Sequence, residues 1–161
     1  MMKAVEVVLY MEAFCPYCNY VHKYILKDIQ IRRDEINRKL RRERLPPIPP
    51  IEIRVIDINA NDGSKYMQWY EWYSRKIGGR FTPIVKIGDK VFYLWGHDKP
   101  ETIEKGQLSR TQLLKKQIIE ELQDITRRVE KEPRFVEQIK PDFELINHKI
   151  VDRTGVIAFW R

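Results

Sequence analysis

The sequence predicts an α/β fold of three layers, in which a central mixed sheet of about four strands carries helices on both faces. Two observations predict it. Apolar, β-branched runs alternate with stretches of helical periodicity in the first half of the 161 residues. Two short apolar runs near residue 90 are separated by Gly-Asp, which is typical of a hairpin that closes a sheet. The expected order of elements is therefore β-α-β-α-β-β-α, followed by a C-terminal extension.

Composition and charge exclude several classes of protein. With 43% apolar residues, the chain is expected to fold around a core rather than remain disordered. No uncharged apolar run approaches the roughly 20 residues of a membrane helix. The apolar start of the chain contains Glu6 and lacks the cleavage site of a signal peptide, so we expect a cytoplasmic protein. The charged fraction of 33% is typical of proteins from thermophiles.

The first strand and the first helix are predicted from the amino-terminal 45 residues. Residues 4–11 (AVEVVLYM) are apolar and β-branched, as in a buried strand. Helical periodicity then runs from the CPYC sequence to about Leu45, which makes the first helix unusually long. The PPIPP sequence at 46–50 ends this helix and forms a stiff link. The apolar stripe of the helix consists of Val21, Ile25, Ile29, Ile36 and Leu40.

The middle of the chain predicts a second strand and an aromatic helix. Residues 51–58 alternate between apolar and polar side chains. Helix 65–77 is capped by Ser64 or Asp62 at its start and is ended by Gly78 and Gly79. Most of its aromatic residues are expected to pack on the sheet, while an exposed pair of Met67 and Trp72 would indicate a partner surface. The stripe consists of Tyr66, Trp69, Tyr70, Tyr73 and Ile77.

The remainder predicts a hairpin, a last helix and an extension. Strands 84–87 and 91–95 form the hairpin, and Ser109 with Gln112 has the spacing of a capping box that opens the next helix. We expect one domain at 1–131 and a C-terminal extension at 132–161. Strands at 143–151 and 156–160 would form a second hairpin there, and the apolar end of the extension makes a homodimer plausible. The stripe of the last helix consists of Leu114, Ile118, Leu122, Ile125 and Val129.

The two cysteines, Cys15 and Cys18, are placed where a strand gives way to a helix. Pro16 suits the first turn of a helix, and the free N–H groups there favour a thiolate on Cys15. Cys18 lies one turn further along, where it can attack a mixed disulfide on Cys15 and release the substrate. Because its side chain points back towards the first turn, Cys18 should be the more buried. We therefore predict thiol–disulfide exchange, with Cys15 attacking and Cys18 resolving.

A metal site is the alternative use of these cysteines. Cys18 and His22 are four residues apart on the predicted helix, and His97 with Cys15 would complete four possible ligands. A second ligand pair with motif spacing is missing, so we favour no metal and no cofactor other than a redox-active Cys15–Cys18 disulfide.

The chain resembles the thioredoxin superfamily, and within it the glutaredoxins most nearly. CPYC at 15–18 is the dithiol form found in glutaredoxins and also occurs in related archaeal and bacterial disulfide oxidoreductases. The segment KIGGRFTPIVKIGDKVFYLWGHD resembles the family's stretch from the end of its second helix through its last two strands. The likeness covers about residues 4–130 in architecture, and its specific motifs cover only 15–18 and about 76–98.

This resemblance implies further site residues. Pro83 should follow a cis peptide bond and face the dithiol, with Pro16 and Tyr17 supporting the site. The backbone of Thr82 should pair with a bound substrate chain. Gly96, His97 and Asp98 partly match the residues that hold the far end of glutathione. The family's glutathione-binding lysine before the dithiol is missing, because Glu12, Ala13 and Phe14 occupy that stretch. A disulfide-containing protein or a small thiol is the implied partner.

The positive charge of the chain suggests a different function. Its formal net charge is +7, and the segment 32–44 carries seven basic and three acidic side chains. Lysine and arginine neutralise phosphates, so this basic helix could serve a binding or adaptor protein for nucleic acid or an acidic partner. No base-reading motif accompanies it, and a solvated helix face explains the charge as well, so we do not expect nucleic acid as a partner.

Overall fold

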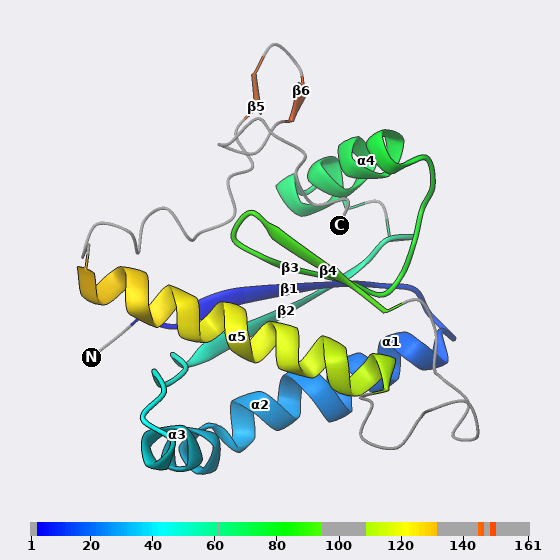
Figure 1. The fold of residues 1–161 in the computed structure, drawn as a ribbon. Helices are drawn as coiled ribbons and strands as arrows, with labels where there is room; N and C mark the ends of the chain where they lie inside the picture. The colour runs from blue at the N-terminus through cyan, green and yellow to red at the C-terminus, as the bar shows by residue number, and fades with distance from the viewer. Residues whose placement is uncertain (1–2, 61, 95–108, 132–144, 147–148, 151–161) are drawn as a thin grey trace.

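The structure is a computed structural model that describes residues 3–60, 62–94, 109–131, 145–146 and 149–150 (Figure 1). Its elements follow the predicted order through α5. They are β1 (Val5–Met11), α1 (Pro16–Tyr20), the π-helical segment η1 (Val21–Leu26), α2 (Lys27–Ile31), α3 (Arg33–Arg42), β2 (Ile51–Asp57), α4 (Lys65–Ile77), β3 (Ile84–Ile87), β4 (Lys90–Tyr93), α5 (Arg110–Lys131), β5 (Leu145–Ile146) and β6 (Lys149–Ile150).

Four strands form one open mixed sheet in the order β2-β1-β3-β4. β1 pairs with β2 in parallel, and Val5 lies opposite Ile51. β3 pairs antiparallel with both β1 and β4. The parallel pair needs a crossover connection, which the helices α1 to α3 supply, whereas β3 and β4 are joined by the tight turn at Gly88. The predicted α/β fold is confirmed.

Helices cover both faces of the sheet and give three layers (Figure 1). On one face the helical run from α1 to α3 packs with α5, and alternate residues of the strands point into this layer. On the other face α4 packs through its aromatic residues. Leu9 of β1 belongs to the first core and Tyr10 to the second, as the period of two in a strand requires. This arrangement has the architecture of a thioredoxin-like fold.

The first helix is not the single helix that we predicted up to residue 45. A π-helical segment follows α1, and the backbone leaves helical geometry at Arg32, with φ −95° and ψ 17°. α3 therefore runs in a different direction from α2 (Figure 1). The bend has a packing reason, because it lets Leu40 join the same core as Ile29 while Asn37 reaches the chain at Ile48.

Three predicted helix ends are confirmed by their hydrogen bonds. The Ser64 hydroxyl accepts a hydrogen bond from the Met67 N–H at 3.2 Å and caps α4. Gly78 ends the same helix with φ 83°, a left-handed conformation that glycine adopts without steric cost. Ser109 and Gln112 bond reciprocally at the start of α5, at 2.9 and 3.2 Å.

The aromatic helix α4 is more completely buried than we expected. Trp69, Tyr70 and Tyr73 are fully buried against the sheet, as predicted. Met67 and Trp72 are buried too, so they do not form the exposed pair that would have indicated a partner surface. The backbone of β6 lies close to this helix, so this short strand is on the α4 side of the sheet.

The extension differs from the predicted strands. β5 and β6 pair antiparallel within 145–150, so the predicted single strand 143–151 is wrong. The second predicted strand, 156–160, lies outside the described residues. The division into 1–131 and 132–161 stays a prediction, as does the homodimer. In the part of the chain that the structure describes, no helix is long and apolar enough to cross a membrane.

Candidate functional site

The dithiol lies at the edge of the sheet where β1 ends. A short turn follows Met11, in which the Cys15 N–H donates to the Glu12 carbonyl at 3.2 Å. Cys15 is the N-cap of α1, and Pro16 occupies the first helical position as predicted. This position leaves the free N–H groups of the helix start beside the Cys15 sulfur.

The two sulfurs differ in exposure and in hydrogen bonding. The Cys18 N–H donates to Cys15 Sγ at 3.2 Å, which is the contact of an N-cap side chain with its helix. Cys18 is only 1% exposed, whereas Cys15 is partly exposed. This is the order that the sequence predicts. Cys15 is thus accessible to a disulfide from solvent, whereas Cys18 is buried below the surface.

The surroundings of Cys18 keep its proton in place. Burial is the main cause that raises the pKa of Cys18, and a hydrogen bond to the Cys15 sulfur adds to the effect, bringing the pKa to about 11. Hydrogen bonds from the Glu12 backbone and from the Thr82 hydroxyl act in the opposite direction. Cys18 is therefore a thiol at neutral pH. The hydrogen bonds from the Glu12 backbone and the Thr82 hydroxyl would stabilise its thiolate once it ionises.

The loop before β3 brings Thr82 and Pro83 to the dithiol. The peptide bond between them is cis, as the resemblance implies, and Pro83 is buried. The Thr82 hydroxyl reaches Cys18 across 64 positions of sequence. Tyr70 of α4 holds the preceding residue by donating its hydroxyl proton to the Phe81 carbonyl at 2.6 Å. The α4 helix therefore fixes the loop from the far side of the sheet.

Arg80 ties the same loop to the end of β2. Its Nη2 donates to the Ile58 carbonyl at 2.7 Å, and its other Nη contacts the Glu71 carboxylate of α4. By contrast, no hydrogen bond engages the backbone N–H or carbonyl of Thr82 among the residues described. The loop is thus anchored directly before Thr82, through Arg80 and Phe81, while the Thr82 backbone has no hydrogen-bond partner in the described part of the chain.

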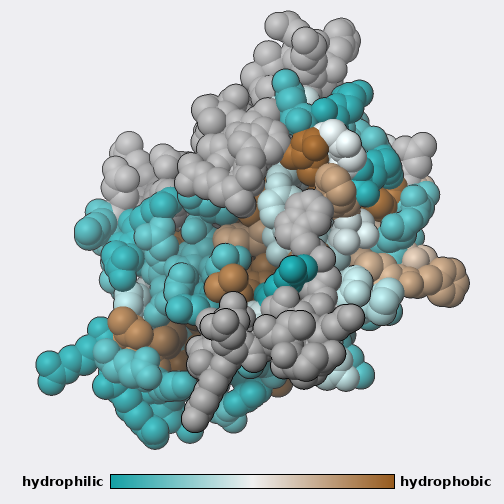
Figure 2. All heavy atoms as spheres, turned by 45° about the vertical axis from the view of Figure 1, so that its right-hand side comes forward, coloured by the Kyte–Doolittle hydropathy of each residue, from teal (hydrophilic) through white to brown (hydrophobic). Residues whose placement is uncertain are grey.

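Two exposed aromatic residues, Phe14 and Tyr17, are close to Cys15 in the sequence. Phe14, directly before Cys15, is fully exposed and has a φ of 64°, a conformation in which bulky residues are uncommon. Tyr17, inside the CPYC sequence, is 38% exposed. Figure 2 turns the α1 end of the molecule towards the viewer and shows hydrophobic side chains among hydrophilic ones on that face. Sequence reasoning missed Phe14, although an aromatic residue beside a reactive cysteine was a visible signal.

The metal alternative gains no support from the described part of the chain. There, no group of three or more His, Cys, Asp or Glu side chains is arranged to hold a metal ion. Burial chiefly lowers the pKa of His22, with nearby Lys27 adding to it. His97 lies outside the described residues, together with Gly96 and Asp98. Their expected roles at the site stay predictions.

The basic segment lies away from the dithiol. It forms α3 and the residues that follow it, at the opposite end of the helical run that begins at Cys15 (Figure 1). Arg33 is 18 positions after Cys15, and at 1.5 Å per residue this run is roughly 27 Å long. The two features are therefore separate surfaces.

Comparisons with protein-family models, with curated proteins and with solved structures found no match for this chain. The case for its function depends on the site itself.

Proposed function

We propose that the protein is a thiol–disulfide oxidoreductase of glutaredoxin-like type that exchanges its Cys15–Cys18 dithiol with disulfides. One observation carries the proposal, namely a partly exposed cysteine that caps a helix, with a buried second cysteine one turn along and a cis-proline loop against it. Helix N-termini favour a thiolate, and the thiolate is the nucleophile in disulfide exchange. No cofactor beyond the cysteine pair is needed.

The exchange proceeds in two displacement steps. The Cys15 thiolate attacks one sulfur of a substrate disulfide, so a mixed disulfide forms and the other substrate sulfur leaves as a thiolate that takes up a proton. Cys18 then loses its proton and attacks Cys15 Sγ, which closes the Cys15–Cys18 disulfide and releases the second substrate thiol. Two electrons pass from the dithiol to the substrate. The same steps in reverse oxidise a substrate dithiol.

The raised pKa of Cys18 sets the order of these steps. Because Cys18 holds its proton near neutral pH, it does not compete with Cys15 for the incoming disulfide. Once the mixed disulfide has formed, Cys15 Sγ no longer accepts a hydrogen bond as a thiolate, so one cause of the raised pKa is removed. The Thr82 hydroxyl remains to stabilise the developing thiolate.

The surface around Cys15 favours a polypeptide disulfide as the substrate. An extended chain beside Cys15 can hydrogen-bond to the open backbone of Thr82, as a strand adds to a sheet. Phe14 and Tyr17 offer apolar contact to the side chains of that chain. The lysine that glutaredoxins use for glutathione is absent before the dithiol. A small disulfide lacks most of these contacts.

Single cysteine variants test the proposal with a disulfide-bonded peptide as substrate. We expect Cys15→Ser to abolish reduction of the peptide, because the attacking sulfur is gone. Cys18→Ser is expected to accumulate a mixed disulfide that mass spectrometry detects as a mass increase of one peptide thiol. Wild-type turnover by Cys15→Ser would contradict the proposal, and so would the absence of an adduct on Cys18→Ser. Circular dichroism of both variants controls for folding.

A further inference from the structure

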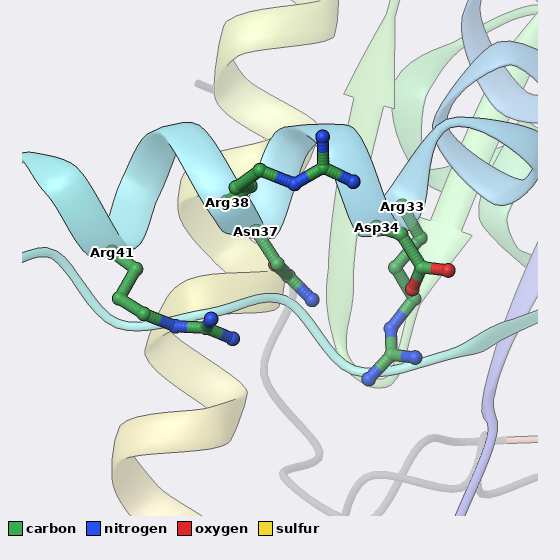
Figure 3. Close-up of a pocket in the computed structure, with 5 residues that line it drawn as sticks. All are labelled: Arg33, Asp34, Asn37, Arg38 and Arg41. Carbon is green, nitrogen blue, oxygen red and sulfur yellow. The ribbon is translucent and has the colours of Figure 1, made fainter.

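A hollow lined by arginines lies on α3, at the end of the helical run that does not carry the dithiol. It is open to solvent, has a volume of about 380 Å³ and is lined by Arg33, Asp34, Asn37, Arg38 and Arg41. Figure 3 shows that Arg33 and Arg41 reach from the helix towards the chain segment that follows it, with Asn37 between them. Arg38 extends along the helix in the direction of Asp34. The proposed dithiol chemistry uses none of these residues.

The positive charge of this hollow is not neutralised by the protein. Within the described ranges, Arg33, Arg38 and Arg41 have no carboxylate within salt-bridge distance. By contrast, Arg32 at the bend is paired with Glu35 at 2.7 Å. With Asp34 as the one carboxylate of the lining, the hollow has an excess of two positive charges. This excess of positive charge in one hollow favours the binding of an anion there.

The wall of the hollow is fixed by hydrogen bonds to one residue of the proline-rich link. The buried Asn37 side chain donates to the Ile48 carbonyl at 3.1 Å and accepts from the Ile48 N–H at 2.7 Å. Arg33 Nε donates to the same carbonyl at 3.0 Å. This bond holds the Arg33 guanidinium while its two Nη groups remain able to donate. A donor that is already oriented loses little entropy when a ligand binds.

The number of guanidinium groups decides which anion fits best. A carboxylate has two oxygens and is satisfied by one bidentate arginine, whereas a phosphate offers three or more acceptor oxygens and up to two negative charges. Three arginines around one hollow match the phosphate. The lining contains no aromatic or aliphatic residue, so it offers no apolar surface that would hold an acyl chain.

We propose that this hollow is a binding site for phosphate groups, independent of the dithiol, with the phosphates belonging either to a free polyphosphate compound or to a nucleic-acid backbone. Further cations on the same helix, Lys39 and Arg42, lie outside the lining. They add general attraction for a polyanion, but they do not define the hollow. Variants of two matched pairs of residues on α3, one inside the lining and one outside it, can therefore distinguish binding in the hollow from general attraction by charge.

The test is isothermal titration of the full chain with pyrophosphate at 0.15 M salt. We expect saturable binding to one site, and a dissociation constant at least tenfold higher for Arg38→Gln with Arg41→Gln. The matched control, Lys39→Gln with Arg42→Gln, removes the same charge from the same helix and should change it less than threefold. Within the part of the chain that the structure describes, none of these four side chains makes a hydrogen bond or an ion pair, so the variants should fold. Arg33→Lys keeps the charge but loses the planar fork, and it should weaken binding severalfold.

Displacement experiments identify the source of the phosphate. If pyrophosphate displaces a labelled 20-base-pair duplex from the wild-type protein, the site accepts a nucleic-acid backbone; if pyrophosphate binds but the duplex does not, the ligand is a free phosphate compound. The proposal is wrong if pyrophosphate shows no saturable binding, or if the two double variants lose affinity equally. It is also wrong if a poly-glutamate peptide binds more tightly than pyrophosphate.

Discussion

At the scale of single residues, the two cysteines of the site differ in exposure, hydrogen bonding and pKa, although they are the same residue type. Cys15 accepts a backbone N–H and faces solvent, while Cys18 is buried with its pKa raised to about 11. A pair of equally exposed thiols would compete for the same disulfide. Under the proposed function, the difference in exposure and the raised pKa of Cys18 together make Cys15 the sulfur that attacks first and Cys18 the one that closes the cycle.

The hydroxyl of Thr82 gives the first residue-scale prediction. It lowers the pKa of Cys18, so Thr82→Val should raise that pKa further and reduce the thiolate fraction at pH 8. We expect the mixed disulfide with a peptide to persist about fivefold longer, the effect of losing a hydrogen bond worth about 1 kcal/mol. Quenched-flow trapping with mass spectrometry measures this lifetime.

A matched control isolates the role of the hydroxyl. Thr82→Ser keeps the donor and should restore a lifetime close to that of the wild type, while the rate at which Cys15 is alkylated should be the same in all three proteins. If Thr82→Ser is as slow as Thr82→Val, the methyl group rather than the hydroxyl is responsible, and the assignment of the Thr82 hydroxyl as the group that stabilises the Cys18 thiolate fails.

The sequence predicts some of these residues and not others, for physical reasons. The position of Cys15 and Cys18 at the start of a helix is predictable, because the preceding strand, the proline and the helix start are all indicated by neighbouring residues in the sequence. Thr82 is 64 positions away, so only the family resemblance could place it beside the dithiol. The exposure of Phe14 follows from a positive φ, which no local pattern of letters specifies.

At the scale of elements, Asn37 joins α3 to the link before β2. Its side chain is the partner of both polar groups of the buried Ile48 backbone, and Arg33 supplies a second donor to the carbonyl alone. Asn37→Ala would leave the Ile48 N–H buried without that partner. We expect the free energy of unfolding to fall by about 1–3 kcal/mol.

Urea denaturation followed by circular dichroism measures this change. Lys39→Ala, on the exposed side of the same helix, is the matched control and should change the free energy of unfolding by less than about 0.5 kcal/mol. Equal effects of the two substitutions would contradict the assignment to the bond with Ile48, because helix propensity favours alanine at both positions and cannot explain a loss of stability.

The bend and the π-helical segment are two features of the first helical run that hydrophobic periodicity does not predict. Val21, Ile25 and Ile29 are spaced by four, and the α-helical period of 3.6 makes such a stripe drift around the helix. The π-helical segment Val21–Leu26 absorbs part of this drift. No helix-breaking residue marks the bend at Arg32. The bend depends on tertiary contacts instead, since Leu40 packs in the core and Asn37 bonds to Ile48.

At the scale of the whole molecule, Glu121 of α5 links global stability to pH. Burial is the main cause that raises the pKa of Glu121 to about 7, against the attraction of Lys90 and Arg128. The carboxyl therefore keeps its proton in the folded state between its ordinary pKa of 4.5 and about 7, where the unfolded chain has lost it. This contribution favours folding at pH 4 and is lost as the pH rises through 7.

Glu121→Gln should remove that pH dependence. We expect the variant to melt about 2–4 °C above the wild type at pH 8, and at the same temperature or lower at pH 4; partial exposure of the side chain keeps the shift small. Calorimetry at both pH values measures it. Glu120→Gln makes the same charge change at an exposed neighbouring position and should give no difference between pH 4 and pH 8. A stabilisation that is equal at both pH values would contradict the assignment to Glu121.

The architecture of the whole molecule was largely predictable, because it depends on patterns repeated over many residues. The alternation of strands with helices, the aromatic stripe around Trp69 and the turn at Gly88 each indicate a face or a turn, and together they define the three layers. Lys86 is an instructive exception. It occupies a buried strand position and lies over the Trp69 ring at 4.6 Å, where the alternation alone would place an apolar residue.

The bent helical run from Cys15 through α3 also determines how the molecule can be attached to a surface or partner. The reactive sulfur lies at one end of this run and the arginine-lined hollow at the other, on separate parts of the surface. A molecule anchored through α3 thus leaves Cys15 open to neighbours on the same support. Under the proposed function, disulfides there would meet the dithiol at an effective concentration set by the tether, so they would exchange quickly even where their own contacts with the site are weak.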